Sequence, residues 1–217
     1  MAGPRLVIAT AVDGVATAFG AEVPDALVDR MQKTVVRMPA LNDPAQPPAA
    51  LEACRQLFTD HGGPVAVSSG PSYVVEGPIA FESAAEIVSS VSTDIGRLRD
   101  ANPGNWEADE WNDLLDGVLG PWAMAWRGDQ VIAICHTARN ADHAVEAGTW
   151  THPDFRGQGH AAAVTAAWAP LVAAGGRIVF YSTSADNRSS QRVAARLGLR
   201  PIGWLWKLDT RSPDGSR

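Results

Sequence analysis

The residues best suited to chemistry in this sequence form the short run Arg156-Gly-Gln-Gly-His-Ala161, directly before an alanine-rich stretch. Where a loop of small residues opens a helix, several backbone N–H groups have no partner within the helix, and the helix dipole adds positive charge. Gly157 and Gly159 lack the Cβ atoms that would block a bulky anion. The run therefore predicts a site for a phosphate or pyrophosphate.

Two common phosphate motifs fit this run poorly. A P-loop requires Lys-Ser or Lys-Thr after its glycines, and neither follows here. Gly157, Gly159 and Ala162 formally satisfy the dinucleotide fingerprint GxGxxG/A. However, no acidic residue follows at the usual distance, and the sequence from Ala162 to Arg217 is too short for a dinucleotide domain. A nicotinamide- or flavin-binding protein is therefore disfavoured.

The elements around this run alternate in type. Apolar spacing predicts a helix within 107–119, and alternation with turn residues predicts an antiparallel meander. The expected strands of that meander are 121–127, 131–136 and 145–151. A helix from about residue 160, a strand at 177–181, a helix capped by Asn187 and a strand at 201–208 complete the pattern. This order predicts an α/β (α+β) fold with a mixed, mostly antiparallel sheet and a βαβ crossover.

Two motifs in this order resemble those of the GNAT superfamily of N-acetyltransferases. Arg156-Gly-Gln-Gly-His-Ala161 is similar to the family's acetyl-coenzyme A motif, [R/Q]-x-x-G-x-[G/A]. Asn187-Arg-Ser-Ser190, followed by Leu197-Gly-Leu199, is similar to its second signature. The resemblance extends from about residue 71 to residue 208 and implies the GNAT fold and acyl transfer from acetyl-CoA.

The resemblance also implies where acetyl-CoA binds. The pyrophosphate would sit on the backbone amides of residues 157–162, and the pantetheine arm would pair with the backbone of residues 149–151 and contact Asn187. A backbone N–H near Trp150 or Thr151 would polarise the thioester carbonyl. The implied cofactor-binding residues are Thr149, Trp150, Thr151, Arg156, Gly157, Gln158, Gly159, His160, Ala161, Ala162 and Asn187.

The expected reaction is direct attack of a primary amine on the thioester, which a general base assists. Glu146 is the candidate base, and its alternative interpretation is a solvated or ion-paired carboxylate on a strand. Many family members carry a tyrosine seven residues after the asparagine, where this chain has Ala194. Ser190 and Tyr181 are candidate substitutes as general acid, and proton donation by bulk water is the alternative.

Several other polar side chains have two interpretations. Arg188, Arg192 and Arg196 either approach the 3′-phosphate or are solvated, and solvation is the interpretation for at least two of them. His136, His143 and His152 match no metal motif and are interpreted as surface or turn residues. The acidic residues of the helix near 107–116 either attract a cationic amine or form a solvent face. Trp111 and Trp150 are candidate acceptor-site residues.

Composition narrows the class of protein further. Twenty-four acidic and 18 basic residues give a net charge of −6, which argues against a nucleic-acid partner. Two cysteines without a metal-binding spacing favour reduced thiols, no metal site and a cytoplasmic protein. The sequence contains no uninterrupted apolar stretch of about 18 residues, so no membrane span is expected. The apolar segment from Met1 to Gly20 favours a strand or loop over a signal peptide.

The predicted domain organisation has three parts. Residues 1–70, with a proline-rich connector, are expected to form a mostly helical appendage of unknown role, before a GNAT domain at 71–210 and a flexible tail at 211–217. The expected acceptor is a small-molecule or peptide amine, and exposed strand edges would permit a homodimer. The alternative function is a non-catalytic acyl-CoA-binding module.

Overall fold

The protein divides into two compact units. The computed structural model describes residues 3–36, 43–91 and 95–210, so the predicted tail at 211–217 lies outside the described residues. The first unit comprises Met1–Ser72, Thr183–Asp186 and Ile202–Arg217, and the second comprises Tyr73–Ser182 and Asn187–Pro201. Strands β3 (Val65–Val75) and β9 (Arg200–Thr210) each contribute residues to both units.

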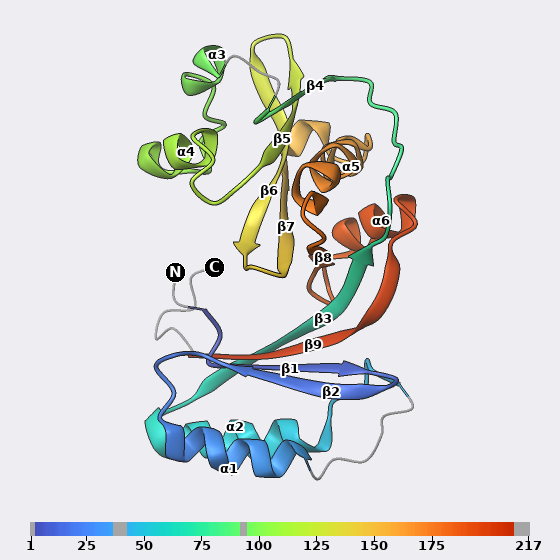
Figure 1. The fold of residues 1–217 in the computed structure, drawn as a ribbon. Coiled ribbons are helices and arrows are strands. Elements are labelled where there is room, and N and C mark those ends of the chain that lie inside the picture. The colour runs from blue at the N-terminus through green and yellow to red at the C-terminus, as the bar shows by residue number, and fades with distance from the viewer. Residues whose placement is uncertain (1–2, 37–42, 92–94, 211–217) are drawn as a thin grey trace. The chain divides into compact units, whose positions relative to one another are not determined.

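The first unit is a small sheet covered by two helices. β1 (Leu6–Ala11) pairs antiparallel with β2 (Gly14–Phe19) on one side and with β9 on the other. Helices α1 (Asp25–Val36) and α2 (Ala49–Gly62) run along this sheet (Figure 1). Their apolar faces form one buried cluster with the strands, in which Leu27, Phe58 and Trp206 take part. Burial of these side chains stabilises the unit.

The N-terminal segment 1–70 differs in part from the prediction. The two expected helices are present as α1 and α2, and the N-terminal apolar stretch forms a strand as expected. The segment is nevertheless not mostly helical, because it contains β1, β2 and the start of β3. β1 pairs with β9, the last strand of the chain, and local spacing does not reveal such a pairing.

Five strands that lie entirely within the second unit are neighbours in the sheet, with a helical crossover between the last two. Strands β4 to β7 are antiparallel neighbours in chain order, and β8 lies parallel to β7. The strands are β4 (Glu86–Ser89), β5 (Trp122–Arg127), β6 (Gln130–Asn140), β7 (Ala144–Thr151) and β8 (Ile178–Ser182). The helices are α3 (Gly96–Arg99), α4 (Ala108–Leu115), α5 (His160–Ala173) and α6 (Arg188–Arg196), with a short 3₁₀ turn at Pro153–Phe155.

Helices cover both faces of this sheet (Figure 1). Val164 and Trp168 of α5 pack with Ala123 and Cys135 on one face, and Leu98 and Trp111 of α3 and α4 pack on the other. The predicted meander and the β7–α5–β8 crossover are both confirmed. The expected α/β (α+β) class with a mixed, mostly antiparallel sheet is therefore confirmed.

Candidate acyl-CoA site

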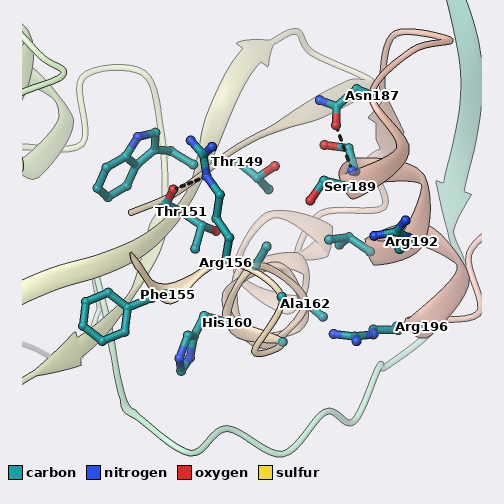
Figure 2. Close-up of a pocket in the computed structure, with 16 residues that line it drawn as sticks. Thr149, Thr151, Phe155, Arg156, His160, Ala162, Asn187, Ser189, Arg192 and Arg196 are labelled. Carbon is teal, nitrogen blue, oxygen red and sulfur yellow. Dashed lines mark hydrogen bonds between the residues drawn. The ribbon is translucent and has the colours of Figure 1, made fainter. Parts of the chain in front are cut away.

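A cavity of about 440 Å³ opens where the end of β7, the start of α5 and the first turns of α6 meet (Figure 2). This volume is in the range of small-molecule sites in proteins. The lining residues are Thr149, Trp150, Thr151, Phe155, Arg156, Gly157, Gly159, His160, Ala161, Ala162, Asn187, Ser189, Ser190, Arg192, Val193 and Arg196. All of them belong to the second unit.

The start of α5 offers unpaired backbone donors to this cavity. Gly159 precedes the helix with φ +92°, a left-handed conformation that residues with a Cβ adopt only with strain. No side chain caps this end of α5, and the first helical hydrogen bond runs from Ala163 N to Gly159 O. The N–H groups of residues 160–162 are therefore available to an anion, as expected at a helix N-terminus.

The cavity lining is positively charged. Arg156, Arg192 and Arg196 all line it, whereas no aspartate or glutamate of the described residues does. Arg156 Nε donates to the Thr151 carbonyl at 3.3 Å, and Figure 2 shows Arg192 and Arg196 projecting from α6. Three guanidinium groups beside a helix N-terminus suit a ligand with several phosphate charges, in a chain whose net charge is −6.

Asn187 holds the facing helix in place. Its Oδ1 accepts a hydrogen bond from Ser190 N at 3.0 Å and so caps α6, as the sequence predicted (Figure 2). This cap fixes the first turn of α6, which presents Ser189, Ser190 and Arg192 to the cavity.

The structure brings ten of the eleven predicted cofactor-binding residues together around the cavity. The exception is Gln158, whose side-chain Nε2 donates to the Asp154 carbonyl instead. Arg192 and Arg196 are exposed, as the solvated interpretation requires, but they also line the cavity. Their four-residue spacing with Arg188 was the sequence signal for this face. Phe155, Ser189 and Val193 were not singled out from the sequence.

His160 occupies the first turn of α5 with its side chain largely enclosed. The residue is 3% exposed, its ring contacts Phe155 at 6.3 Å, and Nε2 has no hydrogen-bond partner among the described residues. Burial, followed by the nearby charge of Arg127, lowers the pKa of His160. The imidazole is therefore neutral at pH 7, so it offers no fixed positive charge to a ligand.

The candidate general acids lie close together. Ser190 lines the cavity, and the Tyr181 hydroxyl, in a residue that is 2% exposed, faces Thr149 and Ser190. No hydrogen bond of acceptable geometry joins that hydroxyl to either residue. Burial raises the pKa of Tyr181, which keeps the phenol protonated. Ala194 is fully buried in the core.

Glu146 stands on β7, outside the cavity lining. Its side chain is 14% exposed and forms an ion pair with the Arg139 guanidinium. Arg139 and Glu146 are cross-strand partners at a bulge in the β6–β7 pairing. The carboxylate that was predicted to be a base is thus also the ion-paired carboxylate of the alternative interpretation.

One histidine does not match its interpretation from the sequence. His143 is exposed in a turn, as expected, but His136 lies within β6 and is largely enclosed, so a surface or turn position was wrong for it. His136 lies two residues after Ile134 and so on the same face of β6, but its enclosure depends on Gly148 of β7 and on Trp106.

Trp111 and Trp150 lie in different surroundings. Trp111 is a core residue whose Nε1 donates to the Leu98 carbonyl, whereas Trp150 lines the cavity. The acidic side chains of α4 are exposed, as a solvent face requires. In the described ranges no cluster of three or more His, Cys, Asp or Glu could hold a metal ion, and no helix there is long and apolar enough to cross a membrane.

Comparison with known families assigns the chain. The family described as "Acetyltransferase (GNAT) domain" matches residues 81–200, more than half of the chain. The chain therefore belongs to the GNAT acetyltransferase family and is an acyltransferase that uses an acyl-CoA donor. This confirms the family resemblance that the two sequence motifs indicated. No curated protein matches the chain significantly.

Solved structures share the fold. A GNAT-family acetyltransferase from Colwellia psychrerythraea aligns with a TM-score of 0.52 at 15% identity, covering 90% of this chain and 76% of that one. A GCN5-related N-acetyltransferase from Kribbella flavida aligns with a TM-score of 0.51 at 20% identity, covering 74% of this chain and 63% of that one. At these identities the likeness establishes the fold.

Proposed function

We propose that the protein transfers an acetyl group from acetyl-CoA to a primary amine by direct attack on the thioester. The observation that carries this proposal is the cavity in which an uncapped helix N-terminus and three arginines converge. When bound, acetyl-CoA supplies an activated acyl group. The residues of the chain would bind it, accept a proton from the amine and donate a proton to the departing thiolate. Membership of an acyltransferase family favours this function over a non-catalytic acyl-CoA-binding module.

Different parts of the cavity suit different parts of acetyl-CoA. The amides of residues 160–162 suit the pyrophosphate, and Arg192 and Arg196 suit a further phosphate. The backbone at Thr149–Thr151 lines the cavity and would bind the pantetheine arm and polarise the carbonyl. Asn187 and the first turn of α6 would close the opposite side.

A proton for the departing thiolate is available at the α6 wall. In this proposal Ser190 Oγ donates to the sulfur, and the Tyr181 hydroxyl, which faces Ser190, would turn to hydrogen-bond to it and return a proton to Ser190. Solvent then returns the proton to Tyr181. Glu146 remains a candidate general base that would accept the proton of the amine. For that role its ion pair with Arg139 would have to open.

Thermal unfolding with acetyl-CoA is the direct test of the donor. Acetyl-CoA at 100 times its Kd adds about 2.7 kcal/mol to the free energy of unfolding, which raises Tm by roughly 5–10 °C for a chain of this size. We expect this shift with acetyl-CoA and not with NAD or ATP. We also expect Arg192→Ala/Arg196→Ala to reduce it, whereas Arg97→Ala, on the distant helix α3, should not.

Two outcomes would contradict the proposal. Equal shifts with ATP and acetyl-CoA would mean that the site recognises phosphates without the acyl-pantetheine arm. A shift with acetyl-CoA but no thiol release above the solution rate with any primary amine would rule out amine acetylation.

A further inference from the structure

His136 lies on the face of the second unit's sheet that α3 and α4 cover. In the β-sheet register it stands between Trp122 of β5 and Gly148 of β7. Trp122 belongs to the buried cluster of α3 and α4, so side chains of this row point to that face. His136 is thus on the face opposite α5, one residue along the sheet from the row of Thr149, which lines the acyl-CoA cavity.

The His136 ring takes the place of a side chain that Gly148 lacks. A Cβ on Gly148 would stand 2.5 Å from His136 Cε1 and 2.8 Å from Nε2, closer than real Cβ contacts. The edge of the ring that carries Cε1 and Nε2 is therefore turned toward Gly148 of β7. The other nitrogen, Nδ1, is not among the atoms nearest to this position.

Two tryptophans connect His136 to the cavity. The Trp106 ring meets the His136 ring at 6.3 Å and the Trp150 ring at 5.7 Å, edge to face in both cases. Trp150 itself lines the acyl-CoA cavity. We call Trp106, Trp150 and His136 the aromatic cluster. It adjoins the cavity through Trp150 alone, and its apolar, electron-rich surfaces suit an amine with an apolar body.

In the described structure, Nδ1 of His136 is the polar atom of the aromatic cluster that is buried without a hydrogen-bond partner. It is buried, and no group in the described part of the chain donates to it or accepts from it. A buried nitrogen without a partner destabilises the protein, so its presence points to a partner that binds later. Nδ1 is covered in this structure, and Trp106, on the irregular segment before α4, is the ring that must move to expose it.

Few other charged groups on this face could take up the proton of an amine in place of His136. Glu146, two residues from Gly148 on β7, forms an ion pair with Arg139 of β6. On the α4 side Glu107, next to Trp106, is exposed, and His152 contacts Trp150 rather than His136. The other carboxylates of α4 are exposed: Asp109, Glu110, Asp113 and Asp116. Burial lowers the pKa of His136, and the hydrogen bond to Gly148 opposes this in part, so the ring is neutral at pH 7.

We propose that the aromatic cluster binds the acceptor amine and that Nδ1 of His136 accepts its proton. The proposal rests on the acetyl-transfer function above. The amine nitrogen forms a bond to the acetyl carbon and the carbon–sulfur bond breaks. The electron pair of that bond leaves with the thiolate, which takes a proton from Ser190 or water. The proton of the amine passes to Nδ1 and then to solvent, which restores the neutral ring.

The test is a pH–rate profile with benzylamine, a primary amine whose ring suits the aromatic cluster. Thiol release from acetyl-CoA is measured for the wild type, His136→Gln and His136→Asn, which keep an amide near one ring nitrogen but cannot take up a proton. His143→Gln, at an exposed turn, is the matched control. Acetyl-CoA binding by each variant is measured by thermal shift in parallel.

We expect both His136 variants to bind acetyl-CoA normally and to lose about 10²–10⁴-fold in kcat/KM. In the wild type, the logarithm of kcat/KM for total amine should rise by about two per pH unit below the pKa of His136 and about one above it, because amine and imidazole must both be unprotonated. The His136 variants should show the shallower slope throughout, and His143→Gln should match the wild type.

Several results would overturn this inference. These are a break in slope that persists in His136→Gln, a break that is lost in Glu146→Gln instead, or no benzylamine turnover by a wild-type protein that binds acetyl-CoA. If the wild type fails to bind acetyl-CoA, the proposed function itself fails, which is a different result from these.

Discussion

At the scale of the residue, the proposed proton transfers depend on single side chains. Tyr181 has a buried hydroxyl without an acceptable hydrogen bond in the described structure, beside Ser190, which reaches the cavity. A hydroxyl in that position contributes little to folding, because its burial is not compensated by a partner. In the proposed mechanism this hydroxyl supplies a proton to Ser190, which would face the leaving sulfur.

Replacement of Tyr181 by Phe separates these two contributions. We expect the free energy of unfolding to stay within about 0.5 kcal/mol of the wild type or to rise, because an unsatisfied polar group is removed. We expect kcat for acetyl transfer to fall by about 10²-fold, the lower end for a lost general acid, since a thiolate leaves readily. Urea unfolding and steady-state thiol release measure the two effects.

Tyr73→Phe is the matched control, because Tyr73 packs edge to face against Tyr181 at 6.5 Å and does not line the cavity. Unchanged kcat in Tyr181→Phe together with a lowered kcat in Ser190→Ala would assign the donation to Ser190 and solvent alone.

At the scale of elements, two helix starts build the site. α5 begins at Gly159 without a side-chain cap and leaves its first N–H groups open, whereas α6 begins with the Asn187 cap. The two helix starts differ in what would supply the missing hydrogen-bond acceptors. An uncapped start is useful only where a ligand supplies the missing acceptors, and a capped start holds side chains such as Ser190 in fixed positions.

Loss of the α6 cap should therefore affect both stability and binding. We expect Asn187→Ala to lower the free energy of unfolding by about 0.5–2 kcal/mol, because Ser190 N loses its acceptor. Acetyl-CoA affinity should fall as well, since Ser189, Ser190 and Arg192 project from the same first turns. Chemical denaturation and isothermal titration calorimetry measure these changes.

Asn187→Asp preserves the acceptor oxygen and should retain most of the stability. If Asn187→Ala lowers stability while acetyl-CoA affinity stays at the wild-type value, the first turn of α6 does not contribute to the site.

At the scale of the whole molecule, the candidate site lies within one of the two units. All of the cavity residues belong to the second unit, and the family match at 81–200 also falls almost entirely within it. The first unit has its own buried cluster, built on α1, α2 and the N-terminal strands. Assignment of 71–210 as the complete acetyltransferase domain remains a prediction, because residues 202–210 of β9 group with the first unit.

Hydrogen exchange should reveal this division. We expect acetyl-CoA to slow amide exchange in the first turns of α5 and α6 by about 10-fold or more, since ligand binding stabilises those segments by roughly 2.7 kcal/mol at 100 times Kd. Peptides from α1 and α2 should show no comparable change. Mass spectrometry with and without acetyl-CoA measures both, and CoA without the acetyl group is a control for the phosphate contacts. Equal protection of α1 and α2 would show that the first unit takes part in binding.

Local patterns in the sequence determined the class of this protein. The glycines and the arginine of residues 156–161 and the Asn187 cap act within a few residues of themselves, so their roles follow from spacing alone. The alternation of 121–127, followed by the turn residues Gly128-Asp129 and a return strand at 131–136, similarly predicts the meander. These features were enough for the fold, the family and most of the cavity lining.

Tertiary structure decided what depends on contacts between distant segments. β1 joins β9, which turns an expected helical appendage into a sheet with two helices. His136 is enclosed because Gly148 lies across from it and Trp106, far earlier in the chain, contacts its ring. Glu146 is committed to an ion pair by the bulge that brings Arg139 beside it. Burial and pairing of this kind arise only when separate strands meet, so no local spacing could have revealed them.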